Sequence, residues 1–233
     1  MHLFYTPDIA LNPELPEEEA SHCLRVLRLG MGDEITLTDG KDCFYRAVIT
    51  VATGKRCQVA IRETIPQPPP RPCHLHIAMA PTKNMDRNEW MAEKVTEIGI
   101  DELTFLDCRF SERRTLKTER VEKILVAAMK QSLKARLPKL NGMVDLDRFI
   151  AESRDGQKFI AHCHDDGGKL PLKDALRPGE DALVLIGPEG DFSEDEVRRA
   201  TARGFVPISL GSSRLRTETA ALVACHTLNL LNQ

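Results

Sequence analysis

A run of prolines divides this chain into two parts. Five of the seven residues 66–72 are proline. Proline lacks a backbone N–H group and fixes its φ angle, so such a run forms neither a helix nor a central strand. It forms a stiff, extended spacer instead. We therefore expect two domains, residues 1–68 and residues 73–233, joined by a linker at residues 66–72.

The part before the linker has the pattern of a small β-barrel. Residues 34–38 alternate apolar and polar side chains and are followed by Asp39-Gly40, a turn sequence. Residues 44–51 and 58–61 have the composition of further strands, and several short strands in a small domain favour a barrel. One short helix is expected at residues 16–27, because it opens with proline and three glutamates.

Helix and strand patterns alternate after the linker, which favours a parallel α/β sheet. The strand candidates are short apolar runs, as in strands that are buried on both faces. Ser193 and Glu196 have the spacing of a helix capping box. Strands are predicted at residues 74–79, 103–106, 158–161, 182–186 and 206–210, and helices at residues 84–98, 118–133, 193–204 and 218–231.

Composition restricts the class of protein further. The chain is 42% hydrophobic and 29% charged, which is ordinary for a globular protein. It has no apolar run near the roughly 20 residues that cross a membrane, and its N-terminus lacks the pattern of a signal peptide. Its seven cysteines include no Cys-x-x-Cys pair and suit free thiols in a reducing compartment. We expect a cytoplasmic protein with no membrane partner.

Positive charge is concentrated in one segment. The net charge is −3, but residues 109–139 hold ten Lys or Arg against three Glu. A basic segment on a mildly acidic body can bind a phosphate backbone locally. The alternative is a solvated helix face with a chance excess of charge, which is the commoner meaning of a charge run.

Two loops carry the motifs with chemical content. The first follows the strand at residues 182–186 with Gly187-Pro188-Glu189-Gly190 and leads into the helix capped by Ser193. In open α/β sheets, ligands bind at the carboxyl ends of strands, and glycine lets the backbone come close to a ligand. This loop is neither a P-loop nor a dinucleotide fingerprint. The alternative is a plain connection between a strand and a helix.

The second loop follows the strand at residues 206–210 and leads into a helix with Thr217 as its expected N-cap. Backbone donors at a helix start suit an electron-rich group. Arg216 could hold a phosphate or a carboxylate, and Glu218 could pair with it, with a cationic ligand or with a nearby arginine. The alternative is an Arg216–Glu218 ion pair that only fastens the helix to the loop.

Together the two loops resemble a family signature. Ile-Gly-Pro-Glu-Gly at residues 186–190 and Leu-Gly-x-x-x-Leu-Arg-Thr-Glu-Thr-Ala at residues 210–220 are similar to the signature of RsmE-type 16S rRNA (uracil-N3) methyltransferases, which belong to the SPOUT class. Further similarities cover nearly the whole chain in order, at residues 22–33, 83–99, 111–113 and 127–132. Two departures, Lys130 in place of a common glutamate and residues 133–135 in place of a more polar run, lie in the basic segment.

The resemblance implies a fold and a reaction. It implies a PUA-like β-barrel that helps to hold RNA, and a SPOUT parallel-sheet domain whose chain end threads a trefoil knot, which no residue pattern could indicate. It also implies a homodimer that uses S-adenosyl-L-methionine. The implied reaction is methylation of N3 of a uridine in the decoding region of 16S rRNA, in the small ribosomal subunit.

The resemblance also implies residue roles. Uracil N3 is a poor nucleophile until it loses its proton, so a general base or cationic stabilisation of the anion is required. Arg216 and Glu218 are the candidates for these catalytic roles. The base must also leave its stack to react. Contacts to the cofactor are expected from Ile186, Gly187, Gly190, Ser209, Leu210, Gly211, Leu215 and Thr217. Contacts to RNA are expected from Arg25, Arg28, Arg87, Arg113 and Arg114.

Histidine and tryptophan are expected to be structural. His74 and His76 share one face of a strand, and His162 and His164 share one face in the same way, but no clear third and fourth ligand is present, so we expect no metal. Trp90 is expected to be a core or dimer anchor rather than a platform for a base.

Three alternatives stay open on the sequence. They are a SPOUT ribose 2′-O-methyltransferase acting on tRNA or rRNA, a non-catalytic RNA-binding module, and a small-molecule or nucleotide-binding α/β enzyme that ignores RNA. The intact cofactor loops argue against the second alternative, and the proline-linked barrel and basic segment argue against the third.

Overall fold

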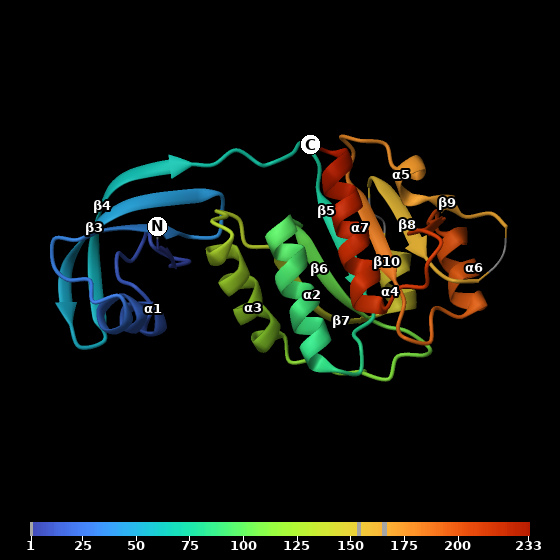
Figure 1. The fold of residues 1–233 in the computed structure, drawn as a ribbon, viewed down its shortest axis with the longest axis horizontal. Helices are drawn as coiled ribbons and strands as arrows, with labels where there is room; N and C mark the ends of the chain where they lie inside the picture. Colours follow the sequence, from blue (N-terminus) through green and yellow to red (C-terminus); the bar gives the residue numbers. More distant parts are fainter. Residues whose placement is uncertain (1, 153–154, 165–166) are drawn as a thin grey trace. The chain divides into compact units, whose positions relative to one another are not determined.

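The computed structural model describes residues 2–152, 155–164 and 167–233, which form two compact units (Figure 1). The first unit contains the chain up to Pro70 together with residues 126–137, and the second contains residues 71–125 and 138–233. The division at residue 70 falls within the proline-rich segment. The assignment of residues 126–137 to the first unit differs from the sequence-based division, which placed them in the second domain.

The first unit is built on a four-stranded sheet with the order β1-β2-β3-β4. The first pair of strands is parallel and the other two pairs are antiparallel. A short helix precedes β2 and passes directly into a π-helical turn, so the helix predicted at residues 16–27 is present but its second half is wound more widely. The elements are β1 (Leu3–Tyr5), α1 (Glu17–Ser21), η1 (His22–Val26), β2 (Glu34–Thr38), β3 (Cys43–Thr53) and β4 (Arg56–Pro66).

Alternation along the strands builds the core of the first unit. Ile35 and Leu37 on β2, and Ala47 and Ile49 on β3, are buried in one cluster, as expected where one face of a sheet is covered. β4 ends at Pro66, the first proline of the linker, which pairs with Cys43 at the edge of the sheet. Proline suits an edge strand because the backbone N–H group that it lacks is not required on the side without a neighbouring strand.

Residues 126–137 belong to the first unit through hydrogen bonds to the β2–β3 turn. The Asp42 N–H donates to Ala135 O at 3.0 Å, and the Leu137 N–H donates to Gly40 O at 2.9 Å. The Arg136 side chain donates to Asp42 Oδ1 at 2.7 Å. These bonds join residues more than ninety positions apart in the sequence, so no local pattern could indicate them.

The second unit contains a seven-stranded sheet with the order β7-β6-β5-β10-β8-β11-β9. Every neighbouring pair in it is parallel, as the alternation of strands and helices predicted. The strands are β5 (Leu75–Met79), β6 (Glu102–Asp107), β7 (Lys139–Asp145), β8 (Gln157–Ala161), β9 (Leu170–Pro171), β10 (Ala182–Ile186) and β11 (Val206–Ser209). The trefoil knot implied by the resemblance stays a prediction.

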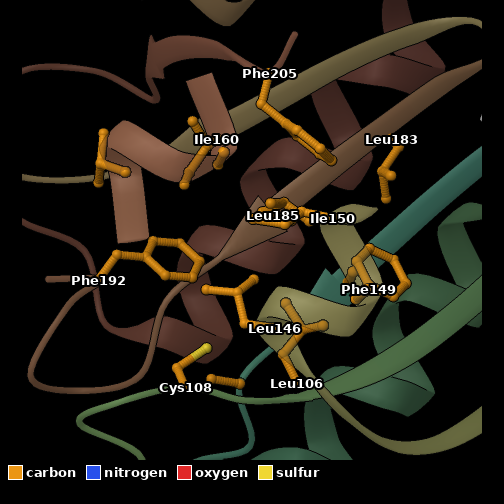
Figure 2. Packing of buried hydrophobic residues seen from close by; sticks show 14 residues of the cluster. Leu106, Cys108, Leu146, Phe149, Ile150, Ile160, Leu183, Leu185, Phe192 and Phe205 are labelled. Atoms are coloured by element: carbon orange, nitrogen blue, oxygen red, sulfur yellow. The ribbon is translucent and has the colours of Figure 1, made fainter. Parts of the chain in front are cut away.

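Helices cover both faces of this sheet (Figure 1). α2 and α7 pack side by side on one face, while α4 and α6 pack on the other. On that second face Leu183 and Leu185 of β10 meet Phe149 of α4 and Phe192 in a buried cluster (Figure 2). The helices are α2 (Met85–Ile98), α3 (Thr118–Gln131), α4 (Leu146–Ala151), α5 (Leu172–Ala175), α6 (Glu194–Ala202) and α7 (Thr217–Leu231).

The predicted capping box is confirmed. The Glu196 N–H donates to Ser193 Oγ, and the Ser193 N–H donates to Glu196 Oε2 at 2.7 Å. The other oxygen of this buried carboxylate accepts from the Arg109 N–H at 2.7 Å. The start of α6 is therefore fixed at the end of the loop that follows β10, which holds that loop in place.

Five elements were not predicted: β1, β7, α4, α5 and β9. β1 has three residues, too few to show alternation. β7 contains Asn141-Gly142, a pair typical of turns, and the pairing of β6 with β7 shifts register next to it. α4, α5 and β9 have six, four and two residues, too few to show a period. No helix in the described part of the chain is long and apolar enough to cross a membrane.

Leu133 offers a test of how α3 ends. It has a left-handed φ of 54° and a half-exposed side chain, and the Lys134 N–H bonds back to Met129 O. This is a C-terminal cap position that favours glycine. We expect Leu133→Gly to have a free energy of unfolding about 1 kcal/mol higher than Leu133→Ala, because both lose the side chain but only glycine loses the strain. Chemical denaturation measures this, and equal stabilities would contradict it.

Candidate active site

A cavity of about 800 Å³ lies at the carboxyl ends of β8, β10 and β11. Register explains why these ends meet. Ile186 of β10 and Ile208 of β11 both pair with Ala161 of β8, one from each side. The two glycine-bearing loops therefore follow strands β10 and β11, which are not adjacent in the sheet because β8 lies between them. The cavity is lined by residues 161–164, 186–189, 191 and 208–218, with Arg87, Lys169 and Ala220.

Glycine is required in both loops, for different reasons. A Cβ atom on Gly187 would lie 2.9 Å from Phe192 N, so the chain folds back too tightly there for any side chain. Gly211 has a left-handed φ of 125°, and a Cβ on it would meet nothing within 4 Å. Its backbone is therefore open to whatever approaches, in a conformation that other residues rarely adopt.

Seven of the eight residues expected to contact a cofactor line this one cavity. They are Ile186, Gly187, Ser209, Leu210, Gly211, Leu215 and Thr217. Gly190 is not among the lining residues. A Cβ on Gly190 would lie 3.1 Å from the Phe110 Cβ, so this glycine makes room for Phe110.

The sequence-based site omitted one wall of the cavity, the loop after β8. His162, Cys163 and His164 line this wall. Lys169 Nζ donates to the backbone oxygens of His162 and His164, and the His164 ring is hydrogen-bonded through Nε2 to Phe192 O at 2.6 Å. The signal was available, because β8 is an apolar strand predicted in the same sheet and ligands gather where such strands end.

Asp191 joins this wall to the loop after β10. It has a left-handed φ of 66°, which aspartate tolerates better than most residues. Its Oδ2 accepts from the Cys163 N–H at 2.7 Å and its Oδ1 accepts from the Phe192 N–H at 2.8 Å. One carboxylate thereby holds two sides of the cavity at a fixed separation.

Glu218 is the buried charge of the cavity. It lies in the first turn of α7 and its side chain is 9% exposed. Its Oε1 is 3.7 Å from Arg87 Nε, while its Oε2 is buried and has no hydrogen-bond partner among the described residues. Of the partners considered for Glu218 on the sequence, the structure places a nearby arginine beside it. Arg216 lines the cavity with an exposed side chain. It is the N-cap of α7, so the N-cap expected at Thr217 is wrong by one residue.

The other arginines expected to contact RNA lie in different settings. Arg113 donates to Thr82 O at 3.1 Å and to Lys83 O, and Arg114 bonds to Asp107 Oδ1 and Arg109 O, so both side chains hold the chain itself. Arg25 and Arg28 are exposed in the first unit. Arg28 has a strained φ of 57°.

The basic segment is partly a structural feature. At least five of its cations pair with carboxylates, which lowers the charge left for a phosphate backbone. Lys130, the departure from the family pattern, pairs with Glu19 of α1. The other four are Arg114 with Asp107, Arg120 with Glu89, Arg136 with Asp42 and Lys139 with Glu102.

His74 and His76 make polar contacts at strand ends, and Trp90 lies at the surface. His76 is hydrogen-bonded to Thr104 at 2.8 Å and His74 lies 3.6 Å from Glu102, at the amino ends of β5 and β6. The described residues contain no group of three or more His, Cys, Asp or Glu that could hold a metal ion. Trp90 is 41% exposed on α2, so the expected core role is wrong, while the role of dimer anchor stays a prediction.

An open parallel sheet with a pocket at the carboxyl ends of its strands defines a ligand-binding α/β domain. The chain belongs to the RNA methyltransferase family: residues 69–229 match the family's RNA methyltransferase domain, and residues 15–62 match its RNA methyltransferase PUA domain.

Solved structures agree along the whole chain. A probable rRNA-methyltransferase from Porphyromonas gingivalis is 45% identical with a TM-score of 0.94, over 100% of this chain and 98% of that one. A putative methyltransferase from Legionella pneumophila, in complex with bound S-adenosylmethionine, is 30% identical with a TM-score of 0.84, over 99% and 97%. A ribosomal RNA small subunit methyltransferase E from Neisseria gonorrhoeae, bound to S-adenosylmethionine, is 26% identical with a TM-score of 0.87, over 99% and 98%.

The Asp191 bridge predicts how the loop after β8 moves. In Asp191→Gly the backbone strain is relieved but both side-chain hydrogen bonds are lost, so we expect the Cys163 amide to exchange with solvent faster than in the unmodified protein. Asp191→Asn keeps one acceptor oxygen and tolerates the left-handed conformation, so its exchange should be intermediate. Hydrogen exchange followed by mass spectrometry measures this. Unchanged exchange in Asp191→Gly would show that the bridge does not hold the loop.

Proposed function

We propose that this protein transfers a methyl group from S-adenosyl-L-methionine to N3 of a uridine in the decoding region of 16S rRNA. The observation that carries the proposal is the cavity between the two glycine-bearing loops, which unites seven of the eight expected cofactor contacts. Whole-chain relatives with S-adenosylmethionine bound support the cofactor. The small-subunit rRNA methyltransferases among them support the RNA.

The lining of the cavity fits this cofactor. The backbone of Ile186, Gly187, Leu210 and Gly211 would hold the adenine and ribose, and the open space beside Gly211 lets a ligand come close. The cofactor supplies an electrophilic methyl group on a sulfonium centre. The protein has mainly to align the nucleophile with that methyl group, which is a matter of positioning.

Two groups of the cavity meet the needs of uracil N3. Glu218 lines the cavity, and its Oε2 accepts no hydrogen bond from the described residues, so its carboxylate can take the N3 proton as a general base. The exposed guanidinium of Arg216 can stabilise the uridine anion that results.

Further parts of the proposal concern partners and location. Arg25 and Arg28 of the first unit would contact RNA, together with Arg113 and Arg114 if RNA displaces their present partners. A homodimer is proposed, and exposed Trp90 and Leu230, on the packed helices α2 and α7, support it. All seven cysteines are free, which supports a reducing cytoplasm.

Mass spectrometry of ribosomal RNA tests the reaction. Cells that lack this protein should lack one N3-methyluridine in 16S rRNA, and the gene for the unmodified chain should restore it. If the missing mark is a ribose 2′-O-methyl group, the alternative SPOUT activity is correct. If no methylated uridine is missing, the proposed function is wrong.

Arg216→Ala should fold but lose most of the activity, because the anion at N3 would lack its cation. Arg198→Ala is a matched control, since Arg198 is an exposed arginine on α6 outside the cavity. The assay is transfer of labelled methyl groups to small ribosomal subunits, with thermal unfolding to verify folding. Full activity in Arg216→Ala would remove Arg216 from the mechanism.

Cys163 reports on occupancy of the cavity without any RNA. It is the exposed cysteine of the chain, and five of the other six are buried. Desolvation and the nearby Asp191 carboxylate raise the pKa of its thiol, while Arg214 and Lys169 oppose them, so labelling by a maleimide should accelerate as the pH rises. S-adenosylmethionine at ten times its Kd should slow labelling of Cys163 roughly tenfold by mass action. Equal rates with and without the cofactor would place it elsewhere.

A further inference from the structure

Arg87 lies in a position that the proposed function does not explain. It was expected to contact RNA, yet it lines the cavity from the first turn of α2 and pairs with Glu218 at the first turn of α7. The pair joins two helices that pack against each other. Arg87 Nε is 3.7 Å from Oε1, and only this oxygen of the carboxylate is engaged.

We propose that Arg87 is a positioning residue for Glu218. By attracting Oε1 it fixes the rotation of the Glu218 carboxylate in the wall of the cavity. This inference rests on the proposed function, because it names the group that prepares the proposed base.

Burial and charge both support this role. Glu218 is 9% exposed in its side chain, whereas Arg87 is 39% exposed. A nearby cation and a helix start both stabilise a buried carboxylate. Glu218 has both, because Arg87 lies beside it and it stands in the first turn of α7.

The reaction that Arg87 prepares is a proton transfer followed by a methyl transfer. The Glu218 carboxylate takes the proton from N3, and N3 uses the released electron pair to bond to the methyl carbon. The bond from that carbon to sulfur breaks, and its electrons stay on sulfur. Glu218 then returns its proton to solvent, while Arg87 touches no reacting atom.

A double-mutant cycle separates positioning from RNA contact. If Arg87 acts through Glu218, Arg87→Gln should lower kcat about tenfold or more with little change in the KM for RNA. In a Glu218→Gln background the same substitution should change kcat by less than about twofold, because nothing remains to be positioned. Arg87→Lys should restore part of the rate, since it keeps the charge. Arg148→Gln, at an exposed position of α4, controls for the loss of one positive charge.

Independent effects of the Arg87 and Glu218 substitutions would instead identify Arg87 as a contact to an RNA phosphate. In that case Arg87→Gln should raise the KM for RNA. The slope of the logarithm of the RNA-binding constant against the logarithm of the salt concentration should fall by about one. The loss of activity should add in full to the loss caused by Glu218→Gln. Additivity of this kind would overturn the inference.

A crystal structure of Arg87→Gln decides the matter without activity. The Glu218 carboxylate should turn away from the rotation that it has beside Arg87, whereas an unchanged carboxylate would overturn the inference. If the unmodified protein methylates no rRNA, the proposed function fails, and this structure still shows whether Arg87 orients Glu218.

Discussion

The pairing of β10 and β11 with opposite sides of β8 is the constraint on which the site depends. The pairing of both strands with β8 ends at Ala161, and neighbouring strands of a sheet lie about 4.8 Å apart. The loops that follow are therefore held roughly 10 Å apart, with the loop after β8 between them. A cavity open to solvent forms between three chain segments that the sheet has already fixed.

Pre-formed walls have an energetic consequence. Three loops of independent mobility would have to be ordered by a ligand, at a cost in binding free energy. Here the capping box at Ser193, the Asp191 bridge and the two hydrogen bonds of Lys169 hold described residues of two of these loops, those after β8 and β10, in advance. Binding energy can then be used to align the reacting groups, on which methyl transfer depends.

Much of this molecule follows from local sequence patterns. The strand at residues 182–186 and the cap at Ser193 were predicted as the structure has them, because periodicity and capping are encoded by neighbouring residues. The two glycine-bearing loops were recognisable for the same reason. β7 was missed because Asn141-Gly142 has the composition of a turn, although a parallel neighbour holds it as a strand.

The remaining features depend on residues that are distant in the sequence. Nothing near Arg87 indicates that it pairs with Glu218, and nothing near residues 126–137 indicates hydrogen bonds to the β2–β3 turn. Gly190 matched a family motif, yet its space is taken by Phe110. A sequence motif identifies residues that the family requires, whereas the structure shows which contact each residue makes.

The most direct test of the account is a crystal structure of this protein with S-adenosylmethionine bound. We predict that its adenine and ribose contact the backbone of Ile186, Gly187, Leu210 and Gly211, with the methyl group directed toward Glu218. A cofactor bound away from these two loops, or a cavity too narrow to admit it, would contradict the claim that the sheet positions them for methyl transfer.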